Sequence, residues 1–265
     1  MTGELRIAST VCLLRDGLGG FEVLMVRRTP SARFMAGAWV FPGGAVDESD
    51  GSPLATSAVS SDSEDLLRWR AAALRELVEE TGIWLYERGA TSERDRSIGE
   101  EVFRIASGAG SRLDGNALRY FANWITPTPL PIRFDTRFFA AVVPDGVDAW
   151  IDGDELVDAA WVRPATAIER SEDGAWVVAF PTQKTLEWLA RFETADAALS
   201  HIDRVDPIPA IQPRLSVADG KVEILVPGDP GFEEAAAGER DPNLLVEAVR
   251  IIASGGDAPA EFKAS

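Results

Sequence analysis

Three carboxylates in the segment 75–83 have the spacing of ligands for a divalent cation. Glu76, Glu79 and Glu80 lie three and four residues apart, so an α-helix would place them on one side. Like charges stacked in this way repel each other, and a bound cation would relieve the repulsion. Ligands that are all oxygen suit a hard ion, so Mg²⁺ or Mn²⁺ is the expected metal. Because Mg²⁺ commonly binds together with substrate phosphates, the spacing also indicates a phosphate-bearing substrate.

A short glutamate cluster is, on its own, more typical of a solvated helix face than of a metal site. The neighbouring segments favour the metal site. The strand-like run Trp39–Phe41 leads into Pro42-Gly43-Gly44, whose glycines permit a sharp turn of the backbone. The glutamate segment then ends at Gly82, a residue type that commonly follows the last turn of a helix. A turn and a helix end therefore frame the carboxylates.

Apolar residues recur at helical spacing in this segment and predict a helix over 65–81 that packs one face on a sheet. These residues are Leu67, Ala71, Leu74 and Val78. Arg75 lies four residues before Glu79, so the two side chains can pair and the arginine can orient the carboxylate.

The segments around this helix predict further strands and helices. Apolar, β-rich runs indicate strands, the first two joined as a hairpin, at 7–14, 21–26, 39–41, 83–86 and 118–125. Helical patterns occur at 98–106 and at 180–192, the second with Thr182 as its N-cap. The segment 47–65 is rich in Ser, Asp and Gly and is predicted to be a surface loop.

Residues 75–83, Arg-Glu-Leu-Val-Glu-Glu-Thr-Gly-Ile, resemble the second half of the Nudix hydrolase box at every fixed position. The box reads G-x5-E-x7-R-E-U-x-E-E-x-G-U, where U is an aliphatic residue. Gly44 would be its first glycine, but Gly44 and Arg75 are 31 positions apart, 17 more than the box allows. The chain therefore resembles a Nudix box over 44–83 that is interrupted by an insertion at about 47–65.

The first glutamate of the box is left unassigned by the resemblance. Leu67 stands at the expected distance before Arg75. Four carboxylates near the two ends of the insertion are candidates to replace that glutamate: Glu48, Asp50, Glu64 and Asp65.

Further segments are similar to the Nudix branch that includes the peroxisomal acyl-CoA diphosphatases, which also carry an insertion inside the box. These segments are 34–44, Trp124-Ile125-Thr126-Pro127 and 131–139, and the similarity spans roughly residues 5–190. The resemblance implies an α/β fold, the Nudix α/β/α sandwich with a mixed β-sheet between helices. We expect a single domain over 1–254 and a disordered tail at 255–265.

The resemblance also implies the chemistry of the site. Glu76, Glu79, Glu80 and the Gly44 carbonyl would hold Mg²⁺ or Mn²⁺, and a bound water would attack a pyrophosphate bond with Glu76 or Glu155 as the base. The implied substrate is coenzyme A or an acyl-CoA, cleaved to adenosine 3′,5′-bisphosphate and (acyl-)4′-phosphopantetheine. Another nucleoside diphosphate derivative (ADP-ribose, NADH or a sugar nucleotide) is the enzymatic alternative. A non-catalytic module that senses a nucleotide is the alternative from another class.

Four arginines are candidates for contacts with substrate phosphates, and for each of them the alternative is a solvated charge or an ordinary ion pair. They are Arg27, Arg28, Arg133 and Arg137. The first two end the strand-like run 21–26 next to the Gly-Gly turn, and the last two lie in the segment 131–139.

The composition restricts the partners and the compartment. The chain has 265 residues and a net charge of −17, which disfavours nucleic acid and anionic membranes but permits a small-molecule diphosphate held by a metal and local arginines. The single cysteine, Cys12, excludes an internal disulfide and favours a cytoplasmic location. The single histidine, His201, argues against a multi-histidine metal site and is expected at the surface. Strand-like runs at 211–217 and 222–226 could complete the domain or supply an edge for a homodimer.

Overall fold

The computed structural model describes residues 4–17, 19–32, 35–94, 97–130, 132–151, 153–218 and 220–238, together with 244 and 248. The tail at 255–265, which we expect to be disordered, lies outside the described residues.

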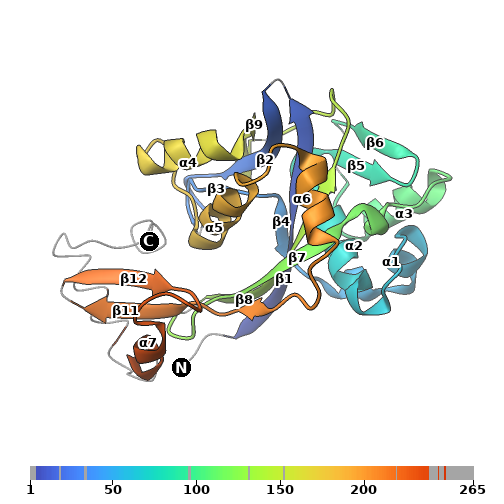
Figure 1. Ribbon diagram of the computed structural model, residues 1–265. Helices are drawn as coiled ribbons and strands as arrows, with labels where there is room; N and C mark the ends of the chain where they lie inside the picture. Colours follow the sequence, from blue (N-terminus) through green and yellow to red (C-terminus); the bar gives the residue numbers. More distant parts are fainter. Residues whose placement is uncertain are drawn as a thin grey trace.

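A mixed β-sheet forms the centre of the fold (Figure 1). Its strands are β1 (Leu5–Gly17), β2 (Gly20–Arg28), β3 (Trp39–Val40), β4 (Gly43–Ala45), β7 (Arg119–Ile125), β8 (Arg133–Val142), β9 (Leu156–Val162) and β10 (Ala210–Ile211). The order is β10-β7-β8-β1-β2-β3, with β4 paired to β1 and β9 paired to β2. The β1–β8 and β10–β7 pairs are parallel and the remaining pairs are antiparallel. The predicted hairpin is the β1–β2 pair.

Helices cover both faces of this sheet. One face packs against α1 (Pro53–Ala58), α2 (Glu64–Thr81) and α3 (Glu100–Gly108), and the other against α4 (Pro164–Glu172), α5 (Phe180–Leu189) and α6 (Ala195–Ile202). Successive side chains of β1 point to opposite faces of the sheet. Val11 therefore belongs to the hydrophobic core beneath α2, and Cys12 belongs to the core beneath α5. The predicted α/β/α sandwich with a mixed sheet between helices is confirmed.

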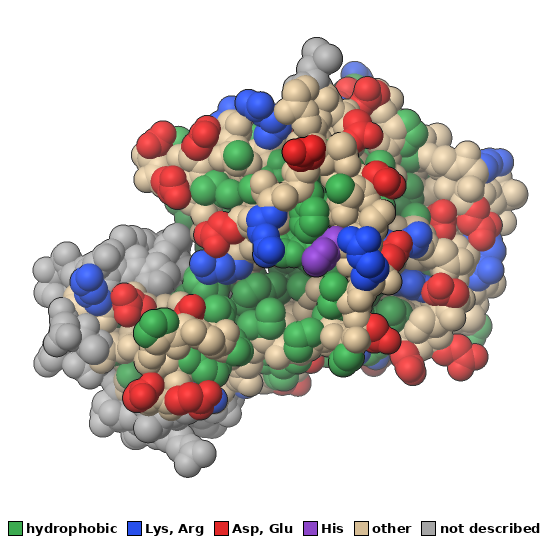
Figure 2. Space-filling view, viewed as in Figure 1, with side chains coloured by type: hydrophobic (Ala, Val, Ile, Leu, Met, Phe, Trp, Pro, Cys, Tyr) green, Lys and Arg blue, Asp and Glu red, His purple; other side chains and the backbone are tan. Residues whose placement is uncertain are grey.

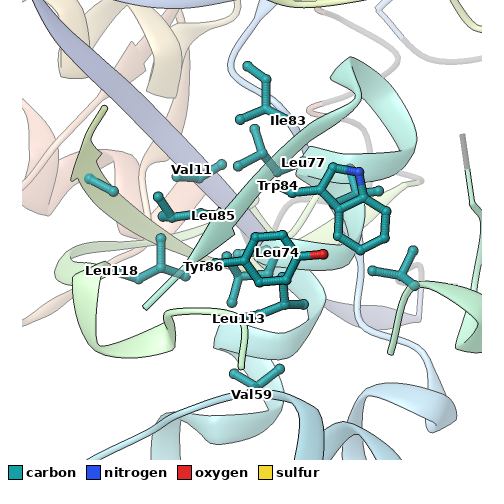
Figure 3. Close-up of a cluster of buried hydrophobic side chains, with 14 of the residues drawn as sticks. Val11, Val59, Leu74, Leu77, Ile83, Trp84, Leu85, Tyr86, Leu113 and Leu118 are labelled. Carbon is teal, nitrogen blue, oxygen red and sulfur yellow. The ribbon is translucent and has the colours of Figure 1, made fainter. Parts of the chain in front are cut away.

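The box helix is α2, and its limits follow the sequence signals. It begins one residue before the predicted start and ends at Thr81. Gly82 has φ = 66° and donates its N–H to the Val78 carbonyl at 2.8 Å, which closes the last turn. Leu74 and Leu77 pack with Val11 and with β5 (Ile83–Tyr86), as Figure 3 shows. The helix therefore presents its apolar face to the sheet and leaves its glutamates on another side.

The insertion is folded, so the prediction of a surface loop at 47–65 was wrong. It contains a 3₁₀ turn, Glu48–Gly51, and then α1, whose N-cap Ser52 accepts a hydrogen bond from the Ala55 N–H at 3.1 Å. Proline in the first turn of α1 presets the helical backbone, and small alanines on its inner face pack against the core. Ser, Asp and Pro thus begin helical turns here, although a composition rich in these residues is also typical of a loop.

The prediction of the N-cap of α5 was also wrong. Thr182 is not the N-cap of α5: the helix begins at Phe180 with Ala179 as its N-cap, and Thr182 is buried inside the first turn. His201, expected at the surface, lies half-buried in the last turn of α6 and is visible on the face shown in Figure 2, with its ring 5.3 Å from that of Phe192. The proline in the first turn of α5, rather than the threonine after it, therefore favours the start of this helix.

The strand-like runs near the end of the described chain form a separate two-stranded hairpin of β11 (Arg214–Ala218) and β12 (Lys221–Leu225), followed by α7 (Phe232–Gly238). Its use as a homodimer edge stays a prediction. On the face shown in Figure 2, acidic side chains are spread over the whole surface, in keeping with the net charge of −17. None of the described helices combines the length and the apolar character needed to cross a membrane.

Candidate active site

The three predicted glutamates lie in the last two turns of α2, next to the backbone of β4. Glu80 is buried and accepts a hydrogen bond from the Gly43 N–H at 2.9 Å. Gly44 contacts the Glu76 carboxylate so closely that a Cβ at position 44 would lie 2.5 Å from its Oε1. Gly43 is equally constrained, because a Cβ there would lie 2.4 Å from the carbonyl oxygen of Ser9. Gly44 therefore allows the β4 backbone to approach Glu76, and Gly43 allows β4 to pair closely with β1.

Arg75 is buried at the centre of the site, with 2 % of its side chain exposed. Its Nη1 donates to Glu76 Oε1 at 2.9 Å and to both oxygens of Glu79 at 3.2 Å. Its Nη2 donates to the Ala45 carbonyl at 3.0 Å, which ties the helix to β4. The predicted pairing of Arg75 with Glu79 is confirmed, and Arg75 fixes Glu76 as well.

Asp50 provides the other half of this network and comes from the insertion. Its carboxylate is fully buried and accepts from Arg75 Nε at 2.8 Å and from Arg75 Nη2 at 3.0 Å. Asp50 Oδ2 also accepts the Asp47 N–H at 2.7 Å. Among the four candidates for the missing box glutamate, Asp50 is thus the one that the structure brings to Arg75. A bidentate pair of this kind fixes the guanidinium plane, and with it the hydrogen bonds to the helix glutamates.

Glu79 has a second hydrogen bond from a segment that the sequence did not connect with the site. Its Oε1 accepts the backbone N–H of Gly99 at 2.6 Å. Gly99 is the N-cap of α3 and has φ = 57°, a backbone conformation that favours glycine. The start of α3, which follows β6 (Gly89–Ser92) in the sequence, therefore lies beside Glu79.

A solved structure that is similar in both fold and sequence identifies the family. No family model matches the chain. The crystal structure of a NUDIX hydrolase from Alicyclobacillus acidocaldarius is 30 % identical, covers 76 % of this chain and 97 % of its own, and superimposes with a TM-score of 0.65. The chain belongs to the Nudix hydrolase family.

Two further relatives of this Nudix hydrolase are similar over most of its length. A Caenorhabditis elegans protein named nudix hydrolase 7 is 26 % identical over 216 residues, which cover 78 % of this chain and 68 % of the relative. The acyl-coenzyme A diphosphatase NUDT19 of Homo sapiens is 26 % identical over 275 aligned positions, which cover 79 % of this chain and 72 % of that protein. The predicted pyrophosphohydrolase activity is thereby confirmed at the level of the family, while the substrate is not.

Burial and mutual repulsion raise the pKa values of two carboxyl groups of the Nudix box. Burial, with a further contribution from the charge of Glu79, raises the pKa of Glu76 to about 7, although Arg75 opposes the shift. Burial, followed by the charge of Glu76, raises the pKa of Glu80 well above its ordinary value. The charged forms of both groups are therefore disfavoured in the absence of a cation, and a divalent ion among them would favour these forms.

The donor chemistry of the box fits a hard divalent ion, because its side chains here are carboxylates beside a backbone turn. Within the part of the chain that the structure describes, no three carboxylate, histidine or cysteine side chains are close enough together to enclose an ion. The hydrogen bonds give the reason: Glu76 and Glu79 turn toward Arg75, and Glu80 turns toward the Gly43 N–H. An ion would share these oxygens with their present donors.

Two of the other predicted residues lie beside Glu80. Arg28, at the end of β2, pairs with Glu155 at 3.8 Å. The charge of Glu155 raises the pKa of Glu80 and that of Arg28 lowers it, so both groups are within electrostatic reach of the box. Arg27 instead lies against the ring of Trp39, 6.0 Å from its centroid.

Of the remaining two candidate arginines, Arg137 contacts the other end of the box helix and Arg133 contacts the segment after β7. Arg137 stacks on Trp69, with its guanidinium carbon 3.6 Å from the ring centroid, and donates to the Asp65 carbonyl at 3.4 Å. Arg133 donates from Nη2 to the Thr126 carbonyl at 3.2 Å. Their role in phosphate binding stays a prediction, since these contacts do not join them to the glutamates.

A cavity of about 990 Å³ also lies beside the N-terminal half of α2. Its walls include Leu66 and Arg70 of α2, Tyr120 of β7 and Ile202 of α6. None of the three box glutamates lines it. The cavity is therefore separate from the carboxylates.

Metal binding is expected to stabilise the protein through the box glutamates. Saturating Mg²⁺ or Mn²⁺ should raise the Tm of the wild type by about 5–10 °C, because an ion that binds only the folded state adds its binding free energy to stability. Glu79→Gln should lose most of this increase. Glu64→Gln, which alters an exposed glutamate at the other end of α2, is the matched control and should keep it. Equal increases in all three proteins, measured by differential scanning calorimetry, would contradict a metal site at the box.

Proposed function

We propose that this Nudix hydrolase cleaves the pyrophosphate bond of a nucleoside-diphosphate-linked substrate, with coenzyme A or an acyl-CoA as the preferred compound. The products would be adenosine 3′,5′-bisphosphate and (acyl-)4′-phosphopantetheine. The observation that supports hydrolysis is the set of three box glutamates held by Arg75 and by the Gly43-Gly44 backbone. The similarity to a human acyl-coenzyme A diphosphatase supports the choice of substrate.

In this proposal Glu76, Glu79, Glu80 and the Gly44 carbonyl hold Mg²⁺ or Mn²⁺, which when bound neutralises phosphate charge and lowers the pKa of a coordinated water. The protein supplies positioning. Arg75 fixes the directions of the Glu76 and Glu79 carboxylates, and the Gly43 N–H fixes that of Glu80. This preorganisation lowers the reorganisation needed when the substrate binds.

Two carboxylates are candidates for the base that removes a proton from the attacking water. Glu76 is held against Gly44 by Arg75, whereas the Glu155 side chain is 68 % exposed and pairs with Arg28. Arg28, at the rim beside Glu80, is a candidate contact for a substrate phosphate. No covalent intermediate is needed, since water is the nucleophile.

The assay that tests the substrate uses CoA, acetyl-CoA, a long-chain acyl-CoA, ADP-ribose and NADH, each with Mg²⁺ or Mn²⁺ and with mass spectrometry of the products. We expect adenosine 3′,5′-bisphosphate from the CoA compounds and none of it from Glu79→Gln. Turnover of ADP-ribose or NADH alone would retain a pyrophosphohydrolase and reject the CoA assignment. No turnover, together with nucleotide binding that needs no metal, would support a sensing module instead.

A further inference from the structure

Two distant segments are hydrogen-bonded to the C-terminal end of the box helix. The Trp150 N–H donates to the carbonyl of Thr81 at 2.8 Å, and the Glu93 N–H donates to the carbonyl of Gly82 at 2.9 Å. Both acceptors are among the last carbonyls of the helix, which need partners from outside it. The segments are therefore fixed within two residues of Glu80.

These contacts bring together an exposed tryptophan and an arginine. The guanidinium carbon of Arg94 lies 4.0 Å from the centroid of the Trp150 ring. Trp150 is 37 % exposed, whereas most tryptophans of the described chain are more deeply buried in the two cores. A planar cation stacked on a partly exposed indole ring presents an aromatic surface and a positive charge side by side.

The same two segments also reach the catalytic carboxylates. The segment that contains Arg94 continues to Gly99, whose N–H binds Glu79. The loop that contains Trp150 continues to Glu155, which pairs with Arg28 beside Glu80. Trp150 and Arg94 thus lie a few residues along the chain from Glu155 and Gly99, which interact with Glu80 and Glu79.

We propose that Trp150 and Arg94 bind the nucleoside half of the diphosphate substrate. The heterocyclic base stacks on the exposed part of the Trp150 ring, and Arg94 attracts the neighbouring phosphate. In a chain with a net charge of −17, a local arginine is needed to attract a polyanionic substrate. This assignment deepens the proposed function, because it names the residues that select a nucleoside-linked diphosphate over other diphosphates.

The test is calorimetric titration with AMP and with ribose 5-phosphate, which differ in the base. Wild-type protein should bind AMP about tenfold more tightly than ribose 5-phosphate, because only AMP has a base that can stack on the Trp150 ring. Trp150→Ala should remove this difference, and Trp150→Phe should keep most of it. Arg94→Ala should weaken both ligands. Arg104→Ala, which removes an exposed arginine paired with Glu101 on α3, is the matched control and should change neither.

Hydrolysis gives an independent readout. Trp150→Ala should raise KM for nucleoside-linked diphosphates about tenfold with kcat retained, since stacking contributes uniform binding. AMP binding that is unchanged in Trp150→Ala, or equal losses of affinity for AMP and ribose 5-phosphate, would overturn the assignment. If the wild type still hydrolyses the diphosphate substrates, the proposed function is retained in either case. Trp150-dependent AMP binding by a wild type that hydrolyses nothing would support the assignment and reject the hydrolase.

Discussion

Replacement of Glu80 by glutamine is expected to lower kcat for pyrophosphate hydrolysis by about 100- to 1000-fold, because a metal ligand that stabilises transition-state charge contributes several kcal/mol. The fold should survive the change. Glutamine has the same length, and its amide oxygen can still accept the Gly43 N–H bond that Glu80 makes at 2.9 Å. The substitution therefore removes the negative charge of the side chain while keeping its size and its hydrogen bond to Gly43.

The same variant should be at least as heat-stable as the wild type when no metal is present. Burial raises the pKa of Glu80 well above its ordinary value, which means that the ionised carboxylate destabilises the folded state. A neutral amide at this position avoids that destabilisation. Steady-state kinetics with Mg²⁺ and calorimetry in chelator measure the two effects. Glu64→Gln is the control for both. A variant that keeps wild-type kcat would show that Glu80 is not part of the reaction, and one that unfolds early would show that its charge is structural.

Removal of the Asp50 carboxylate is expected to have the largest effect on stability. Asp50→Ala should lower the free energy of unfolding by about 3–5 kcal/mol, because it leaves the buried guanidinium of Arg75 without the partner that binds two of its nitrogens. Hydrolysis should fall as well, since Arg75 would no longer hold Glu76 and Glu79 in fixed directions. Asp50→Asn should lose less, because its amide oxygen can still accept one hydrogen bond.

The matched control is Glu48→Ala, which removes an exposed carboxylate from the same 3₁₀ turn. This variant should change the free energy of unfolding by less than about 0.5 kcal/mol, as is usual for surface substitutions. Urea unfolding curves of the three variants give the comparison. Equal losses for Asp50→Ala and Glu48→Ala would mean that the insertion, rather than the Asp50–Arg75 pair, accounts for the stability.

The sequence by itself determined the elements that depend on neighbours along the chain. The helical spacing of Leu74 and Val78 predicted α2, and Gly82 predicted its end, because helix periodicity and left-handed termination are local properties. Pro42-Gly43-Gly44 predicted the turn that approaches the glutamates, since glycine permits an approach that a Cβ would block. The spacing of Glu76, Glu79 and Glu80 predicted that these side chains share one side of α2.

Only the tertiary structure decided which distant groups complete the site. Asp50 lies 25 residues before Arg75, in an insertion whose composition predicted a loop, and nothing in that composition distinguishes it from Glu48. Trp150 and Arg94 lie in connections without periodicity, and they meet because Trp150 and Glu93, the neighbour of Arg94, are hydrogen-bonded to the end of α2. Patterns along the chain report the local backbone, whereas the burial of a charge or the pairing of two side chains depends on contacts between segments that only the fold brings together.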